Sequence, residues 1–118
     1  IRVDRAAKLL FNAGADIRVQ QKLSTLQTTT IGPAAGATID ASDIVFFVAG
    51  VNGTGGGLAE TPKTVEIGVD NVVQANVYAP NGTIWWKDRT QARGSSIGKD
   101  VQLALDVQIT LDSYWAGQ

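Results

Sequence analysis

Pairs of carboxylates are the residues of this chain best suited to carry out chemistry. Asp40 lies three residues before Asp43, and Asp70 and Asp88 fall near each other in the repeat described below. Two facing carboxylates can serve as the acid and base of a glycosidase, and stacked acidic turns can bind Ca²⁺. Most of these residues stand beside turns, where an Asp side chain caps its own backbone. We therefore favour the capping role over a glycosidase pair, and no recurring Gly-x-Asp array supports Ca²⁺ binding.

The sequence contains no Cys, His or Met. It therefore has no thiolate or imidazole metal ligand, no Cys or His nucleophile and no disulfide. Ser95 and Ser96 lack a His partner, and a Ser–Lys arrangement with Lys99 would need a pocket. We expect no enzymatic activity, no catalytic residue, no metal site and no cofactor.

Trp85, Lys87 and Arg89 alternate along one expected strand, on the side opposite Trp86. A Trp flanked by cations can stack on a sugar ring or pack against a neighbouring subunit. We predict that these three residues form a contact face for protein or polysaccharide, with ordinary surface cover as the alternative.

A glycine run forms the second expected contact. Gly55, Gly56 and Gly57 resemble a phosphate loop, but no Lys-Ser/Thr pair follows them directly and no helix is expected to begin there. We predict instead a flexible insertion over about residues 55–63. Within it, Gly55, Gly56, Gly57 and Leu58 are expected to contact another subunit.

A repeat of about 17 residues organises the second half of the chain. Its members are i, i+2 pairs of apolar residues, a spacing that places two side chains on one face of a strand. We therefore predict stacked strands joined by tight corners, which is a β-solenoid. The predicted stacks are Ile67/Val69, Ile84/Trp86 and Val101/Leu103; Val73/Ala75, Thr90/Ala92 and Val107/Ile109; and Val77/Ala79 with Gly94/Ser96.

Earlier segments extend the pattern. Residues 48–54 parallel 77–83 at a longer offset, which the insertion explains, and residues 31–36 suggest a further coil. Asn52-Gly53-Thr54 and Asn81-Gly82-Thr83 match glycosylation acceptors, but we interpret both as turns. Corners are expected wherever Gly or Asn can adopt positive φ. These are Asn12-Ala13-Gly14, Ala35-Gly36, Asn52-Gly53, Asn81-Gly82 and Ile97-Gly98-Lys99-Asp100.

The two ends need covering, because an open strand edge invites pairing. Residues 2–11 form either a capping helix or the first strand, and we prefer a strand over 8–11 followed by another over 16–19. Tyr114 and Trp115 are expected to cap the last coil.

Composition predicts one all-β domain over residues 1–118. Hydrophobic residues make up 44% of the chain and charged residues 18%, a globular balance. The net charge is −1, and the scattered cations argue against a nucleic-acid partner. The longest apolar run, residues 44–49, is too short to cross a membrane. A chain that starts at Ile1 suggests a processed or partial protein.

Three segments near the C-terminus resemble a known group. They are residues 76–85, Ile97-Gly98-Lys99-Asp100-Val101 and residues 107–113. Their turns are similar to those of the β-helical choice-of-anchor A and polymer-forming (bactofilin-like) group of bacterial extracellular proteins. The resemblance implies secretion, attachment to the cell surface and self-association; it departs from the cytoskeletal members in its glycine insertion and Trp-rich face.

These observations predict a non-enzymatic subunit or module of an extracellular fibre, sheath or cell-surface layer that forms homo-oligomers or filaments. The alternative is a polysaccharide-binding module of a larger surface protein, with Trp85 as the platform. Neither alternative involves nucleic acid or insertion into a membrane.

Overall fold

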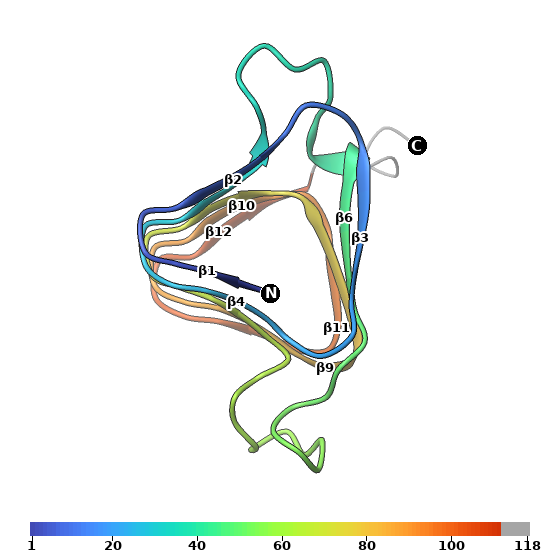
Figure 1. The fold of residues 1–118 in the computed structure, drawn as a ribbon. Coiled ribbons are helices and arrows are strands. Elements are labelled where there is room, and N and C mark those ends of the chain that lie inside the picture. The colour runs from blue at the N-terminus through green and yellow to red at the C-terminus, as the bar shows by residue number, and fades with distance from the viewer. Residues whose placement is uncertain (112–118) are drawn as a thin grey trace.

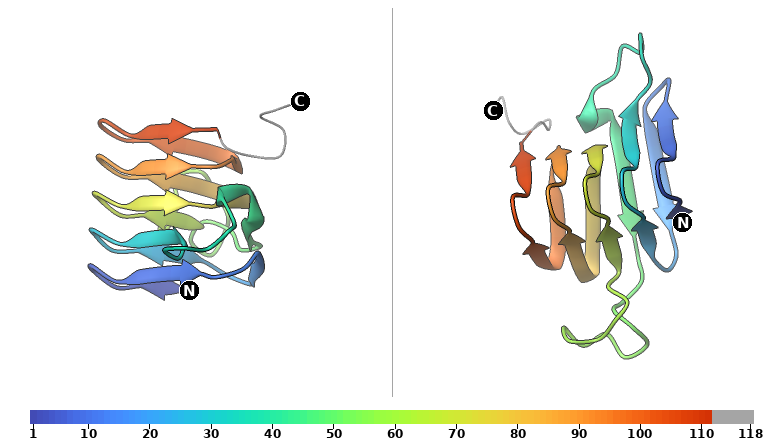
Figure 2. Two further views of the ribbon diagram at one scale, coloured as in Figure 1. Left: turned by 90° about the horizontal axis from the view of Figure 1, so that it is seen from above. Right: turned by 90° about the vertical axis from the view of Figure 1, so that its left-hand side faces the viewer.

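The computed structural model describes residues 1–111, and these residues form an all-β structure with one short 3-10 helix. Neighbouring strands pair in parallel throughout, in two curled sheets of seven and five strands. The chain passes round three faces, and each pass lies on the one before it (Figure 1, Figure 2). The predicted all-β class is confirmed.

Face 1 is the five-stranded sheet. Its inward side chains stand in register from one end of the stack to the other, in the order Leu9, Ile31, Val73, Ala92 and Ile109. Because alternate residues of a strand point to opposite sides, the residues flanking these positions point outward. The strands of face 1 are β2 (Lys8–Phe11), β5 (Thr30–Pro33), β8 (Val72–Gln74), β10 (Gln91–Arg93) and β12 (Gln108–Thr110).

The seven-stranded sheet bends into faces 2 and 3, because two of its strands continue round the corner between them. The first part of β9 (Asn76–Trp86) pairs with β6, and its last part pairs with β7. The strand β11 (Ser96–Leu103) follows β9 along both parts. Face 2 also contains β3 (Ala15–Val19) and β6 (Ile44–Val48), and face 3 contains β1 (Arg2–Val3), β4 (Leu23–Thr25) and β7 (Val65–Ile67).

Large apolar side chains fill the space between the faces. Trp86 and Phe46 are the largest that are fully buried, and Phe46 meets Phe11 edge to face at 6.2 Å between ring centroids. The Trp86 indole Nε1 has no hydrogen-bond partner among residues 1–111. Burial of apolar area therefore holds Trp86 in place without help from its polar group.

One corner has the same backbone conformation in every pass. Between faces 3 and 1, a residue other than glycine adopts a φ of about 57–63°. Its N–H donates to the next pass: Thr28 N bonds Val69 O at 2.9 Å, and Arg89 N bonds Leu105 O at 2.8 Å. The ladder of backbone bonds thus continues through the corner and offsets the cost of this conformation. The five residues are Ala6, Thr28, Asp70, Arg89 and Asp106.

Buried polar side chains line the inside of this corner. Asn71 Nδ2 donates to Leu26 O at 2.8 Å and to Val69 O at 3.0 Å, and Asn71 Oδ1 accepts from the hydroxyl groups of Thr25 and Thr29. Because unpaired polar groups are costly inside a protein, this cluster specifies how the passes align.

The predicted corners at Asn81-Gly82 and Gly98-Lys99 are confirmed in position, but their predicted positive φ is wrong. Both lie inside the extended strands β9 and β11, and neither glycine has a positive φ. Gly36 and Gly53 do have positive φ, at 81° and 53°. The recurring left-handed corner was missed, because none of its five positions holds Gly or Asn, the residues on which the corner predictions relied.

The predicted spacing of about 17 residues holds only for the last pairs of the stack, those that follow the corner between faces 2 and 3 in β9 and β11. There Ile84 pairs with Val101, Trp86 with Leu103 and Ala92 with Ile109, as predicted. In the pairs immediately before that corner the spacing is 19, so the predicted pairings are wrong there. In the structure Ile67 pairs with Trp86, Val73 with Ala92, Val77 with Ser96 and Ala79 with Gly98. Ile31 pairs with Leu9 on one side and with Val73 on the other. Phe46 pairs with Val77, where Val48 was predicted.

The difference arises at the corner between faces 2 and 3. Residues 80–82 make this corner in β9, whereas Lys99 alone makes it in β11, where the pairing register shifts. A corner that is shorter by two residues shortens the whole pass. The repeat therefore has no uniform length.

The chain leaves the stack in two long connections, both at corners (Figure 1). Residues 34–43 join β5 to β6 and contain the 3-10 helix Ala41–Asp43, and residues 49–64 join β6 to β7. The second contains the predicted insertion and is longer than predicted. The preferred strands near the N-terminus are confirmed as β2 and β3, and the capping helix is wrong.

The left-handed corner leads to a stability prediction. Thr28 is β-branched and exposed, whereas Asn accepts this conformation more readily. We expect Thr28→Asn to raise the free energy of unfolding by about 0.5–1 kcal/mol, measured by urea titration. The control is Thr30→Asn in β5. This variant should lower the free energy of unfolding, because Asn is disfavoured in strands. A loss of stability in both variants would contradict the explanation.

Candidate functional site

Trp85 lies in an outward row of face 3. Arg2, Ser24, Glu66, Trp85 and Gln102 follow one another in register along β1, β4, β7, β9 and β11. The Trp85 side chain is partly buried and points away from the core, opposite Trp86, as its alternation predicts. Its role as a contact face stays a prediction.

Lys87 covers one side of the Trp85 ring. Its Nζ lies 4.5 Å from the ring centroid and 3.1 Å from Glu66 Oε1. Trp85, Lys87 and Glu66 therefore form one cluster, in which a cation–π contact and an ion pair share the same ammonium group.

Arg89 is separate from this cluster. It occupies the left-handed corner, where its guanidinium holds the Asp70 carboxylate by bonds of 2.8 and 3.3 Å. These bonds keep the pKa of the Asp70 carboxyl below its ordinary value. The structure therefore places two of the three predicted contact residues together and the third at an adjacent corner.

Asn52 anchors the glycine-rich connection to the stack. It is fully buried, and its Oδ1 accepts from Thr64 N and Thr83 N, each at 3.0 Å. Its Nδ2 donates to Thr83 Oγ1 at 2.8 Å and to Gly57 O at 3.3 Å. The side chain thus supplies the acceptor that the backbone ladder lacks where the connection interrupts it, and a glycan could not reach this amide in the folded chain.

A carboxylate organises the tip of the same connection. Glu60 Oε1 accepts from Gly55 N at 2.8 Å, and Oε2 accepts from Gly57 N at 2.7 Å. These backbone donors lower the pKa of Glu60. Gly56 donates to Asn52 O, and the Leu58 side chain remains exposed. The predicted insertion therefore has a defined shape, and its contact with another subunit stays a prediction.

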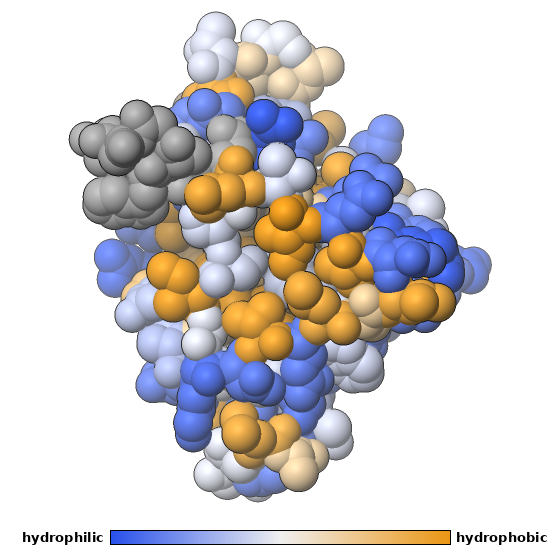
Figure 3. All heavy atoms as spheres, turned by 180° about the vertical axis from the view of Figure 1, so that it is seen from behind, coloured by the Kyte–Doolittle hydropathy of each residue, from blue (hydrophilic) through white to orange (hydrophobic). Residues whose placement is uncertain are grey.

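An apolar end of the stack was missed by the sequence prediction. Val101 is 39% exposed and Leu103 is 57% exposed, although the residues they pair with, Ile84 and Trp86, are both 0% exposed. Seen from this end, apolar side chains gather across the middle of the molecule (Figure 3). The predicted caps Tyr114 and Trp115 lie outside the described residues. We name this surface the apolar end; it comprises Val101, Leu103, Leu105, Ile109 and Leu111.

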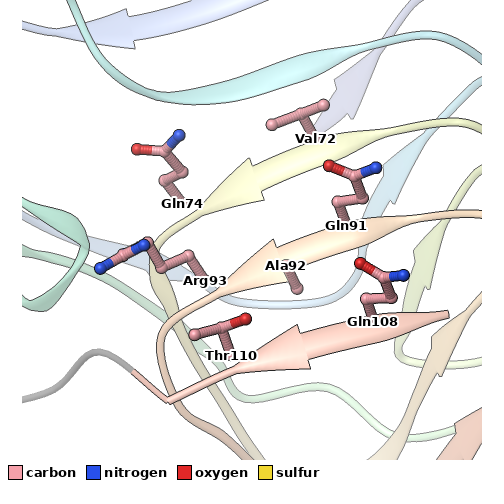
Figure 4. A pocket seen from close by; sticks show the side chains of 7 residues that line it. All are labelled: Val72, Gln74, Gln91, Ala92, Arg93, Gln108 and Thr110. Carbon is pink, nitrogen blue, oxygen red and sulfur yellow. The ribbon is translucent and has the colours of Figure 1, made fainter.

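Face 1 carries a shallow groove of amide side chains between two outward rows (Figure 4). Gln91 and Gln108 are paired in register, and Gln74 lies on the neighbouring strand. The groove has a volume of about 180 Å³. Sites that enclose a small molecule usually measure about 300–1,000 Å³, so this groove is too small to enclose one.

The carboxylates considered for acid–base chemistry have structural partners. Asp40 accepts from Ser42 N, and Asp43 accepts from Asp40 N, which caps the 3-10 helix. The hydrogen bond from the Ser42 hydroxyl lowers the pKa of Asp40. Asp88 accepts from Leu105 N at 3.1 Å. A glycosidase acid needs a raised pKa, whereas the pKa of Asp40, like that of Asp70, is lowered.

No protein-family model, curated protein or solved structure matches the chain. In the part of the chain that the structure describes, no three carboxylates lie close enough to hold a metal ion. The same residues include no helix of a length and hydrophobicity suited to spanning a bilayer.

The two Asn-Gly-Thr motifs offer a matched test of the anchor. Asn52→Ala removes the acceptor of two buried N–H groups, so we expect it to lower the free energy of unfolding by about 3 kcal/mol in urea titration. Asn81 is exposed and makes one bond, to Ala49 O at 3.1 Å. Asn81→Ala should therefore cost less than about 1 kcal/mol. Equal losses in the two variants would contradict the anchoring role.

Glu60 predicts a dependence on pH. A carboxylate with a lowered folded-state pKa stabilises the protein above its ordinary pKa, here 4.5, and loses that effect as the pH falls through the folded-state value. Wild type should therefore be more stable than Glu60→Gln at neutral pH, and the difference should shrink below pH 4.5. Urea titrations from pH 7 to pH 3 measure this difference in the free energy of unfolding. A difference that stays constant over this range would refute the assignment to Glu60.

Proposed function

We propose that the chain is a short β-solenoid that serves as a non-enzymatic structural subunit or module of an extracellular fibre, sheath or cell-surface layer, and that its copies associate end to end. The three ladders of parallel strands and the corner repeated in each pass support the solenoid. An extracellular location and the resemblance to polymer-forming proteins belong to the same proposal.

The observation that carries the proposal is the apolar end. Val101, Leu103 and Ile109 occupy inward positions, where preceding passes bury their side chains. A further layer of strands would bury them in the same way. Among residues 1–111 no strand pairs with the outer edge of β11 or β12, the strands to which these residues belong, and such an edge is a template for another chain.

A second copy of this chain is the occupant that fits best. β12 and β2 are the two edges of the same parallel sheet, so a head-to-tail arrangement would place β12 of one copy on β2 of the next with strand direction preserved. At the β2 end, Leu9, Phe11 and Ile17 are only partly buried and would meet the apolar end. Contacts between two different surfaces do not close on themselves, so they produce filaments.

A charge at the apolar end tests the proposal. We expect the mass of the wild-type protein in light scattering to rise with concentration above the 12.4 kDa monomer, and Leu103→Lys to remain monomeric. Leu103 is exposed, so the variant should keep its fold, as checked by circular dichroism and thermal unfolding. The matched control is Val72→Lys, an outward residue on a middle strand, which should associate like wild type.

Two further results would refute end-to-end association. Monodisperse wild-type protein at every concentration would show that the apolar end is covered within one chain. Equal loss of association in both Lys variants would show that the contact is not specific to the end. Electron microscopy of the wild-type material should show filaments, and closed dimers in their place would contradict the head-to-tail arrangement.

A further inference from the structure

A cationic groove lies on the outside of face 3 and begins at the end of the stack opposite the apolar end. It has a volume of about 300 Å³ and is lined by four cations and a single carboxylate. Ten Lys and Arg residues are spread over a chain with a net charge of −1, so four in one groove concentrate positive charge there. The cations are Arg2, Lys22, Lys63 and Lys87, and the carboxylate is Glu66. Arg2 also pairs with Asp4 beside the groove, at 3.2 Å, but both side chains are well exposed and such a pair is weak, so Arg2 can exchange it for a ligand.

Two of these cations are held by neutral groups. Lys22 Nζ donates to Gly53 O at 3.0 Å, and Lys63 Nζ donates to Leu58 O. A carbonyl oxygen accepts a hydrogen bond without neutralising the ammonium charge, and each ammonium has three donors. Lys22 is partly buried and keeps charge and donors for a ligand, whereas Lys63 is only 7% exposed and adds its charge from within the wall of the groove.

The register of the strands explains why a groove forms here. Ser24 stands between Arg2 and Glu66 in the outward row of face 3, and its short side chain leaves a depression between the two longer ones. Leu26 and Pro62 line the same groove and add apolar surface. The glycine-rich connection supplies one wall, through Pro62 and Lys63.

The remaining carboxylate limits the type of ligand. Glu66 Oε1 is paired with Lys87, and Oε2 accepts from Lys63 N at 2.7 Å. A carboxylate has about four acceptor sites, so Glu66 and the Ser24 hydroxyl can also accept from hydroxyl groups. Anionic groups and hydroxyl groups occur together in an acidic sugar chain, whereas the DNA backbone has no hydroxyl donors.

The extent of the groove favours a chain over a single ion. Its lining residues come from β1, β4 and β7 and from the residue after β9, which are four successive layers of face 3. At a strand spacing of about 4.8 Å, four layers span about 14 Å. From this length, the excess of cations and the acceptor groups, we infer that the groove binds an acidic polysaccharide. This inference is independent of end-to-end association.

Paired double variants test the groove. The probes are polygalacturonate oligosaccharides, dextran sulfate and neutral dextran, with affinity measured by isothermal titration calorimetry. We expect the acidic probes to bind and Arg2→Gln/Lys22→Gln to weaken that binding about tenfold or more, since each lost charge-assisted bond contributes to affinity. The control, Lys8→Gln/Lys99→Gln, changes net charge equally but lies outside the groove, and it should stay within about twofold of wild type.

Other results would overturn the inference. These are equal binding of neutral dextran, no binding of either acidic probe, or equal weakening in both double variants. Displacement of the oligosaccharide by an equal charge concentration of sodium sulfate would indicate a site for a simple anion. Tighter binding of single-stranded DNA than of either acidic probe would indicate a different class of partner. Thermal unfolding of both variants checks that the fold is retained.

Discussion

The fold depends on a backbone ladder that must continue round each pass of the chain. A pass in the middle of the stack is covered on both sides, so an N–H group without an acceptor there would cost stability. The corner between faces 3 and 1 shows this constraint most clearly. Thr28, Asp70 and Arg89 adopt the same left-handed conformation despite their different side chains, because it lets each N–H reach the next pass.

Side chains of Asn replace the backbone where the ladder is interrupted. Asn52 accepts from two N–H groups at the point where the connection 49–64 leaves the stack, and Asn71 donates to two carbonyl groups inside the repeated corner. Both residues are buried, and each satisfies several partners at once. Departures from the regular stack are therefore confined to corners, where one amide side chain can satisfy the groups that are left over.

The same geometry separates two kinds of surface. Side chains that point outward from the faces do not pack in the core, so charged groups such as those around Glu66 can gather there without disturbing it. At the two ends of the stack no further strand among residues 1–111 covers the inward positions or pairs with the strand edges. An end therefore suits contact with another layer of strands, and a face suits contact with a ligand.

Much of the strand pattern was determined by the sequence alone. The i, i+2 pairs Ile84/Trp86 and Val101/Leu103 identify inward positions, because alternation along a strand is a local property. The opposite orientations of Trp85 and Trp86 follow from the same rule. Tertiary structure decided the register of the earlier passes, because the register depends on how many residues make each corner. In β11, for example, Lys99 alone makes the corner that three residues make in β9. Tertiary structure also decided that Ala6 and Arg89 would adopt a left-handed conformation, that Lys22 and Lys63 would line one groove with Ser24, and that Leu103 would lie exposed. Each of these outcomes depends on contacts between residues far apart in the chain, which local patterns do not record.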